Sequence, residues 1–302
     1  MKVALYSRTP LAAAPLEIWK ALERYGVGIE TSLINRTLGY RDGRRFPGHL
    51  LASNADAARA LKGADLWHVH NYWDREPLDA LLARYGRPVV AQFHSVPRLG
   101  NWAELQSKAK ISYTIRQPLQ AREYAPFMTM PNLVDADERR PARRSMEGPV
   151  RIAFAPSTQA PVGHPASKGR AEVLAILKTV AAERAVEVVL IEGVPYEENL
   201  KLKRSAHILV DDVVTGNWHR TSLEGACFAC AVLNAARQQG AAWPWVHATL
   251  ASLRAKLLQL IDDRPLLIRV QEMTRAWILG SEFHALEGVK EYVKAYQEVL
   301  SA

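Results

Sequence analysis

A lysine and a glycine stand where a phosphate site would need them. Lys168 and Gly169 come directly before a predicted helix that begins at Arg170. The first turn of a helix has unpaired N–H groups and partial positive charge, so a lysine at this point suits the binding of phosphate. The Gly-x4-Gly-Lys-Ser/Thr spacing of nucleotide-binding loops is absent, which excludes that class of site.

Histidines end two predicted strands in the first half of the chain. His68 and His70 close the segment ADLWHVH, and His94 closes PVVAQFH. Such residues can be scaffold groups held by hydrogen bonds, or they can reach a ligand at the edge of a sheet. In the second half, Glu224 opens a predicted helix, where a carboxylate can accept two hydrogen bonds from a ribose diol; an ordinary acid favoured by the helix dipole is the alternative.

Cys227 and Cys230 form a C-x-x-C pair, which would suit redox chemistry or zinc. They lie within the apolar run ACFACAVL, and the chain has no other cysteine to complete a zinc site. We therefore expect two buried structural thiols in a reducing compartment.

The acidic pairs do not predict a metal site either. Asp135 and Asp137 form an Asp-x-Asp triplet, but they fall in a predicted linker rather than at a strand end, and such triplets are common by chance. Asp211 and Asp212 are equally unpersuasive as ligands. We expect no metal and no resident cofactor.

Short apolar runs alternate with helical patterns, which indicates βαβ units and parallel sheets covered on both faces. The helix that ends at Gly26 carries Leu16, Trp19 and Leu22 at helical spacing. Strands are expected at 2–7, 29–34, 64–70, 88–94, 110–115, 127–130, 150–157, 186–193, 207–212 and 231–236. Helices are expected at 16–26, 77–86, 170–184, 196–204, 222–228 and 284–302.

This rhythm predicts an α/β protein with two Rossmann-like, doubly wound domains facing a central cleft. The polar, proline-bearing segment 134–149 suits a linker between a domain at 1–135 and a domain at 150–280. The last helix, within 281–302, is expected to pack back on the first domain. Ligands in such architectures bind at the carboxyl ends of the strands.

The charge is unevenly distributed along the chain. The formal net charge is +8, and residues 1–140 hold 20 Lys and Arg against 14 Asp and Glu, a net +6. A basic half can meet nucleic acid, an anionic lipid surface or an acidic substrate. No basic run exceeds two residues, so a solvated basic surface is an equal alternative.

Taken in order, the motifs resemble the GT-B glycosyltransferases of family 4, over most of the chain. The resemblance rests on QFHS at 92–95, PNLVD at 131–135, the Pro156-Ser157 pair, Lys168-Gly169 and SLEGA at 222–226. It implies that the second domain holds a nucleotide-sugar donor and that the first holds the acceptor. Transfer with retention of the anomeric configuration, without metal, is implied as well.

The resemblance also implies roles for single residues. Lys168 would hold the diphosphate, Glu224 the ribose, and His94 would lie near the reacting sugar, so that His94 and Lys168 are the catalytic candidates. The donor contacts would come from Pro156, Ser157, Lys168, Gly169, Gly216, Asn217, Trp218, His219 and Glu224. The acceptor or the cleft would be lined by His70, Asn71 and Ser95.

Three departures from the family pattern stand out. Gly216 occupies the position, eight residues before Glu224, where the family has a glutamate that contacts the donor sugar. The contact could then fall to loop backbone, to Asn217 or to His219. The glycine-rich first loop is replaced by TPLAAAP, whose alanines permit a close approach less readily than glycine. Arg170 lies near Lys168, but a second basic contact to the diphosphate is not recognisable.

We therefore expect a cytoplasmic glycosyltransferase that takes a nucleotide-diphosphate sugar, based on UDP or GDP, as its co-substrate. The acceptor stays open among membrane-bound lipid, polysaccharide, small molecule, protein and nucleic acid, and an anionic or membrane-associated acceptor is favoured over nucleic acid. Association with the inner face of the membrane and the oligomeric state stay open too. The alternatives are a degenerate nucleotide-sugar binding protein without transfer, and an epimerase or hydrolase on the same fold.

Overall fold

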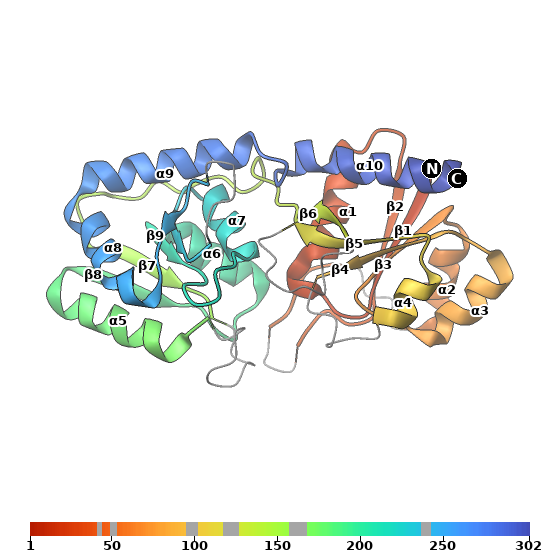
Figure 1. Ribbon diagram of the computed structural model, residues 1–302, viewed down its shortest axis with the longest axis horizontal. Coiled ribbons are helices and arrows are strands. Elements are labelled where there is room, and N and C mark those ends of the chain that lie inside the picture. The colour runs from red at the N-terminus through yellow and green to blue at the C-terminus, as the bar shows by residue number, and fades with distance from the viewer. Residues whose placement is uncertain (41–43, 49–52, 95–101, 117–126, 157–167, 237–242) are drawn as a thin grey trace. The chain divides into compact units, whose positions relative to one another are not determined.

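The computed structural model contains two compact units, each built on a parallel sheet (Figure 1). The first unit comprises Met1–Arg41, Arg45–Leu133 and Glu282–Ala302, and the second Asp42–Arg44 and Val134–Ser281. The structure describes residues 1–40, 44–48, 53–94, 102–116, 127–156, 168–236 and 243–302. The α/β class with two doubly wound sheets is confirmed.

The sheet of the first unit has six parallel strands in the order β2-β1-β3-β4-β5-β6. Their inner residues are almost all buried because helices cover both faces, which explains the nearly continuous apolar runs of the sequence. The strands are β1 (Lys2–Ser7), β2 (Glu30–Asn35), β3 (Leu66–His70), β4 (Val89–Phe93), β5 (Ile111–Arg116) and β6 (Met128–Pro131).

Among the described residues, five α-helices and a 3-10 turn complete this unit, and its core is rich in aromatic rings. Phe93 stacks on Trp102 with ring centroids 3.9 Å apart, and Trp67 and Trp73 are buried in the same cluster. The helices are α1 (Ala14–Tyr25), α2 (Asn54–Lys62), α3 (Arg75–Tyr85), α4 (Trp102–Lys108) and α10 (Ala285–Ser301), and the turn is η1 (Leu11–Ala13).

The terminal helix α10 packs against α1 and β6 through a stripe that recurs every three or four residues. Tyr292 donates from its hydroxyl to the carbonyl of Pro131 (2.8 Å) and accepts from Gln92 Nε2 (2.8 Å). At Gly288 a Cβ atom would meet the carbonyl oxygen of Glu282 at 2.1 Å, so the close approach of this helix requires a glycine.

The second sheet has the strand order β8-β7-β9-β10-β11, which repeats the order β2-β1-β3-β4-β5 of the first sheet. Its strands are β7 (Val150–Phe154), β8 (Val186–Leu190), β9 (Ile208–Val210), β10 (Ala231–Asn234) and β11 (Val246–His247). Its helices are α5 (Arg170–Glu183), α6 (Tyr196–Ser205), α7 (Arg220–Cys227), α8 (Leu250–Asp262) and α9 (Arg264–Leu279). Helices α5 and α8 pack together on one face, while α7 packs on α6 and α9 on the other (Figure 1).

In this order the chain turns back at β7, because β8 lies on one side of it and β9 on the other. The carboxyl ends of β7 and β9 therefore form the switch point of the second unit, where ligands of open α/β sheets bind. The segment 134–149, expected as a linker, belongs to this unit. Arg144 ties it down by donating to the carbonyls of Phe228 (2.9 Å) and Ala229 (2.6 Å).

Two expectations about elements need correction. Helix α7 begins at Arg220, with His219 as its N-cap, so Glu224 lies in the middle of the helix and does not open it. Ser222 and Glu224 are residue types that often stand at the start of a helix, which explains the wrong prediction. In the structure the hydroxyl of Ser222 donates to Asp211 and does not cap the helix. In addition, the sequence patterns predict no element in the segments that form α2, α4, β11, α8 and α9.

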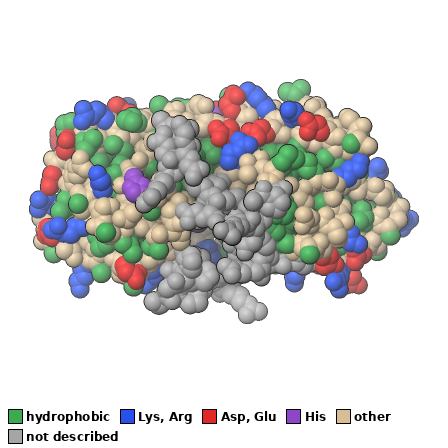
Figure 2. Space-filling model, in the orientation of Figure 1, with side chains coloured by type: hydrophobic (Ala, Val, Ile, Leu, Met, Phe, Trp, Pro, Cys, Tyr) green, Lys and Arg blue, Asp and Glu red, His purple; other side chains and the backbone are tan. Residues whose placement is uncertain are grey.

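No helix among the described residues is both long enough and apolar enough to cross a membrane. Figure 2 shows one face of the molecule, on which the Lys and Arg side chains of the described surface are interspersed with Asp and Glu. The described Lys and Arg side chains form no single basic patch on that face.

The loop after β1 is held in a strained conformation. Leu11, Ala12 and Ala13 have φ of 46°, 53° and 68°, in the left-handed region that disfavours residues with a Cβ atom. This is the TPLAAAP loop, where the family pattern has glycine. The alanines here adopt a glycine-like backbone at a cost of about 1 kcal/mol each.

Replacing Ala12 by glycine should therefore stabilise the protein, by about 0.5–1 kcal/mol in the free energy of unfolding. Ala12 is exposed, so little packing is lost. The matched control is Ala181→Gly at an exposed position of α5, which should destabilise by about 0.5–1 kcal/mol. Urea denaturation measures the free energy of unfolding of both variants. An equal loss of unfolding free energy in Ala12→Gly and Ala181→Gly would show that the backbone at Ala12 is not strained.

Candidate functional site

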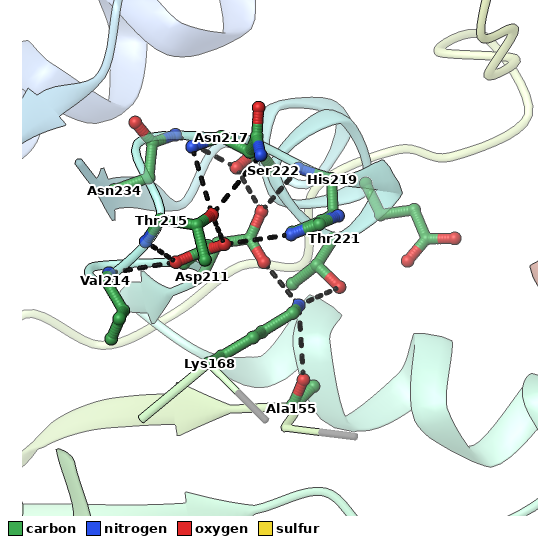
Figure 3. A network of polar contacts seen from close by, with 12 residues as sticks. Ala155, Lys168, Asp211, Val214, Thr215, Asn217, His219, Thr221, Ser222 and Asn234 are labelled. Atoms are coloured by element: carbon green, nitrogen blue, oxygen red, sulfur yellow. Dashed lines mark hydrogen bonds and ion pairs between the residues drawn. The ribbon is translucent and has the colours of Figure 1, made fainter. Parts of the chain in front are cut away.

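Lys168 lies at the switch point of the second unit (Figure 3). Lys168 has a φ of 55° and Gly169 a φ of 65°, so the two residues form a left-handed turn. The turn stands directly before α5, where the sequence predicts that Lys168 lies. The turn leads the side chain inward, where Nζ contacts Asp211 Oδ1 (2.5 Å), the Ala155 carbonyl (3.4 Å) and Thr221 Oγ1 (3.5 Å). Only 9% of the side chain is exposed.

Gly169 is required by this turn for two reasons. Its φ is positive, and a Cβ atom there would lie 2.7 Å from Cγ2 of Val214, in the loop that follows β9. The glycine thus lets two loops of the switch point approach each other.

Asp211 follows β9 and is completely buried. Its second oxygen, Oδ2, accepts from the backbone N–H of His219 (2.9 Å) and from Ser222 Oγ (2.6 Å), and that hydroxyl accepts in turn from Asn234 Nδ2 (3.1 Å). Burial alone would raise the pKa of the Asp211 carboxyl, but the Lys168 ammonium group outweighs it, so the pKa falls below its usual range. Asp211 is thus a carboxylate that joins two strands, a helix and a loop.

Asp212 organises the loop that leads to α7. Its Oδ1 accepts from the backbone N–H groups of Val214 (2.9 Å) and Thr215 (2.8 Å), and its Oδ2 contacts His219 Nε2 (3.1 Å) and the Thr215 hydroxyl. Burial would raise the pKa of Asp212, yet these hydrogen bonds, led by the one with His219, lower it.

The loop residues expected to contact a donor differ in how accessible they are. Gly216 has a φ of 78° and is partly exposed, like Asn217 and His219. Trp218 is fully buried, and its ring lies 5.6 Å from that of Trp243 in an aromatic cluster with Trp245 and Trp277. Its side chain therefore supports the loop from within the unit.

Glu224 does not face an open site in this structure. It is 1% exposed, its Oε2 accepts from Lys203 Nζ (2.5 Å), and its Oε1 accepts from the Tyr196 hydroxyl (3.0 Å). Both partners come from α6, so the carboxylate ties α6 to α7. Lys203 and Tyr196 are absent from the sequence-based site because neither belongs to the motif, and nothing local marks them as partners.

The first unit brings the predicted histidines together at the ends of β3 and β4. His70 Nδ1 lies 3.0 Å from His94 Nε2, and the His94 backbone N–H donates to Asn71 Oδ1 (2.6 Å). Asn71 has a φ of 60°, which turns the chain sharply after the strand. Burial lowers the pKa of His70 well below its usual value, so His70 is neutral near pH 7.

His68 continues this row inward. Its ring is 4.2 Å from that of His70, and its Nδ1 hydrogen bonds to the hydroxyl of Tyr296 on α10 (2.8 Å). Burial lowers the pKa of His68 to about 3. A scaffold role therefore fits His68, while His94 is the partly exposed member of the row.

The remaining predicted residues divide between buried and undescribed positions. Pro156 is buried, and Ser157 and Ser95 lie outside the described residues. Cys227 and Cys230 are buried free thiols, as predicted, and burial raises the pKa of Cys230.

The acidic triplet also has a structural use. Asp135 Oδ1 accepts from the backbone N–H groups of Asp137 and Glu138, each at 3.0 Å. Among the residues that the structure describes, no group of three or more His, Cys, Asp or Glu side chains is arranged to hold a metal ion.

Removing one member of the buried pair between α6 and α7 should be costly. Lys203→Met leaves the Glu224 carboxylate without its counter-charge, and we expect a loss of about 3–5 kcal/mol in the free energy of unfolding. In Lys203→Met/Glu224→Leu most of that loss should be recovered, because no charge stays buried. The exposed pair Arg184–Asp262 is the control, and Arg184→Met should change urea denaturation little. A small loss of unfolding free energy in Lys203→Met would contradict the stabilising role of the buried pair.

The buried histidines should make stability depend on pH. Folded His68 has its pKa lowered to about 3, whereas the unfolded chain takes up a proton below about 6.5, so the free energy of unfolding falls as the pH drops through this window. Between pH 6.5 and 5 the contribution of His68 is about 2 kcal/mol. His68→Gln should flatten this dependence in urea denaturation at several pH values, whereas the control His247→Gln, at an exposed position, should leave it as in the parent.

Comparisons with known proteins address the fold. No family model and no curated protein matches the sequence. The structure resembles an α-glucosyltransferase solved with UDP and a 13-mer DNA containing a HMU base, with a TM-score of 0.68 and 10% identity over 100% of both chains.

Two further solved structures are similar over nearly the whole chain. Sucrose-phosphate synthase from Thermosynechococcus elongatus has a TM-score of 0.64 and 11% identity, over 100% of this chain and 99% of that one. HepE from Anabaena, solved with UDP and glucose, has a TM-score of 0.63 and 10% identity, over 99% of this chain and 100% of that one. The chain therefore has the fold of the GT-B glycosyltransferases, as its motifs predict, while its place in family 4 stays a prediction.

Proposed function

We propose that the protein transfers a sugar from a nucleotide-diphosphate donor to an acceptor. The observation that carries this proposal is the position of Lys168, whose ammonium group lies at the switch point of the second sheet of a GT-B chain. Open α/β sheets bind their ligands at that point. The solved structures with the same fold include one bound to UDP and one bound to UDP and glucose.

The chemistry of the step suits the residues present. When the anomeric bond breaks, negative charge develops on the leaving diphosphate, and a fixed cation aimed at it stabilises the transition state. We assign this role to Lys168. We assign to His94, which is oriented by Asn71 and His70, the contact with the reacting sugar. We further propose retention of configuration and a reaction without metal.

The donor would lie along the loop from Asp212 to His219 and the turn at Lys168–Gly169. Val214 is exposed and Thr215, Gly216, Asn217 and His219 are partly exposed in that loop; of these, Gly216, Asn217 and His219 are the predicted donor contacts. For Glu224 to bind a ribose diol, the diol would have to replace Lys203 or Tyr196 as its partner. The side chain of Glu224 is thus a weaker candidate than the motif alone implies.

For the acceptor we propose an anionic molecule or surface, because residues 1–140 carry a net charge of +6. Duplex DNA is one such acceptor, and the similar α-glucosyltransferase was solved with DNA. Binding of DNA would fall steeply with salt, since phosphate contacts release counterions.

A second candidate is a nucleotide-sugar binding protein without transfer. Two observations favour it: Gly216 replaces the glutamate expected to contact the donor sugar, and both Glu224 oxygens already have protein partners. An epimerase or hydrolase on the same fold would also use the donor site.

A thermal-shift screen against UDP, GDP, ADP, CDP and their sugars tests the donor. A ligand at 100 times its dissociation constant should add about 2.7 kcal/mol to the stability of the folded state. Lys168→Met should abolish the shift, whereas Lys201→Met, at an exposed position of α6, should keep it. No shift with any nucleotide would refute the proposal.

A donor that binds should then be tested for turnover. Release of the nucleoside diphosphate, with acceptor or by hydrolysis, is expected and should be lost in Lys168→Met. A chelator should leave the rate unchanged, and recovery of a chelated enzyme by Mn²⁺ or Mg²⁺ would contradict metal independence. Saturable binding without turnover over lipid, polysaccharide and DNA acceptors would favour the binding protein.

A further inference from the structure

The network around Lys168 contains a carboxylate for which the glycosyltransferase motifs assign no role. We propose that Asp211 is a positioning residue for Lys168, which keeps the ammonium group charged and fixed so that the second unit binds the phosphates of its donor. This inference rests on the proposed function and adds to it a determinant of phosphate affinity.

The geometry of the lysine gives the first argument. An ammonium group has three N–H donors. One is used at 2.5 Å by Asp211 Oδ1, while the carbonyl of Ala155 and the hydroxyl of Thr221 lie at 3.4 and 3.5 Å, long for hydrogen bonds (Figure 3). Phosphate oxygens could replace these two long contacts with shorter ones while Asp211 keeps its own.

Burial gives the second argument. The Lys168 side chain is 9% exposed and that of Asp211 is fully buried. A buried ammonium group without a counter-charge is disfavoured relative to the neutral amine, which cannot attract a phosphate electrostatically. Asp211 supplies that counter-charge, at the shortest of the three contacts of Lys168 Nζ.

Asp211 is itself held rigidly, as a positioning group must be. Its Oδ2 is fixed by the His219 backbone N–H and by the Ser222 hydroxyl, and Asn234 supports that hydroxyl from β10. The neighbouring Asp212 directs its oxygens to the loop at 214–215 and to His219. Asp212 thus organises the donor loop itself, so the carboxylate for comparison is Asp262, which lies outside the site in an exposed pair with Arg184.

A competing effect decides the direction of the test. A carboxylate beside Lys168 also repels a diphosphate, so its removal would strengthen binding if repulsion dominated. If instead Asp211 keeps the ammonium group charged and in place, its removal weakens binding, and only the part of the binding that depends on phosphate.

Calorimetric titration of a nucleoside diphosphate and of its parent nucleoside measures that part. We define the phosphate factor as the dissociation constant of the nucleoside divided by that of the nucleoside diphosphate. The pair used is the one whose diphosphate binds most tightly among UDP, GDP and ADP. Asp211→Asn should lower this factor about tenfold to a hundredfold at pH 8, the range for one hydrogen bond to a charged group. The nucleoside should bind as before, which a general structural defect would not allow.

Companion variants separate positioning from damage. Lys168→Met should lower the factor as much as Asp211→Asn, and the double variant should be no worse, because the two side chains act as a unit. At pH 6 the factor should recover in Asp211→Asn, measured against the parent protein, but not in Lys168→Met. Asp262→Asn, in the exposed pair with Arg184, should keep the factor of the parent.

Each other outcome is decisive. If Asp211→Asn keeps or raises the phosphate factor, the positioning role is wrong while the proposed function stands. If the parent protein binds no nucleotide, the proposed function fails and this inference fails with it. If circular dichroism shows that Asp211→Asn does not fold, Ser222→Ala replaces it, since it removes one holder of Asp211; an unchanged factor in that variant overturns the inference.

Discussion

The buried ion pair between Lys168 and Asp211 is the interaction on which the second unit depends. It lies at the carboxyl ends of the paired strands β7 and β9, where two loops and the start of α7 meet. A parallel sheet aligns the carboxyl ends of its strands, but it leaves their polar groups to be satisfied by the loops that follow. Asp211 meets this requirement with one side chain, which accepts from a lysine, a backbone N–H group and a hydroxyl.

The sequence predicts the elements better than their partners. The strand runs, the class of fold and the placement of Lys168 directly before α5 follow from local patterns, because apolar periodicity and a glycine turn are written in consecutive residues. The partners of Lys168 and Glu224 lie 43 and 21 residues away along the chain, and no local pattern joins them. For this reason the sequence alone indicates no role for Asp211 beyond that of an unpersuasive metal ligand, and it predicts a helix start at Glu224.

The two acidic residues show how one residue type acquires different uses. Glu224 lies on the face of α7 that packs against α6. Lys203 and Tyr196 donate hydrogen bonds to both of its oxygens, so its carboxylate joins the two helices. Asp211 sits at a strand end, and its lysine comes from a loop whose two further contacts are long. The pair at the strand end can therefore exchange weak contacts for a ligand, whereas the pair between the helices would have to give up strong ones.

In the first unit, backbone strain is found in the turns after two central strands. Leu11, Ala12, Ala13 and Asn71 all have positive φ in turns that follow β1 and β3, the two strands between which the order of the first sheet reverses. Residues with side chains adopt this conformation only when the surrounding structure imposes it. The turn at Asn71 delivers a hydrogen bond to the His94 backbone, so its strain has a visible use in orienting a candidate catalytic residue. In the second unit Lys168 has the same conformation at the switch point, while Ala229, before β10, is an exception. The less favourable local choices thus lie mainly at the switch points, where a ligand site needs chain conformations that regular packing does not provide.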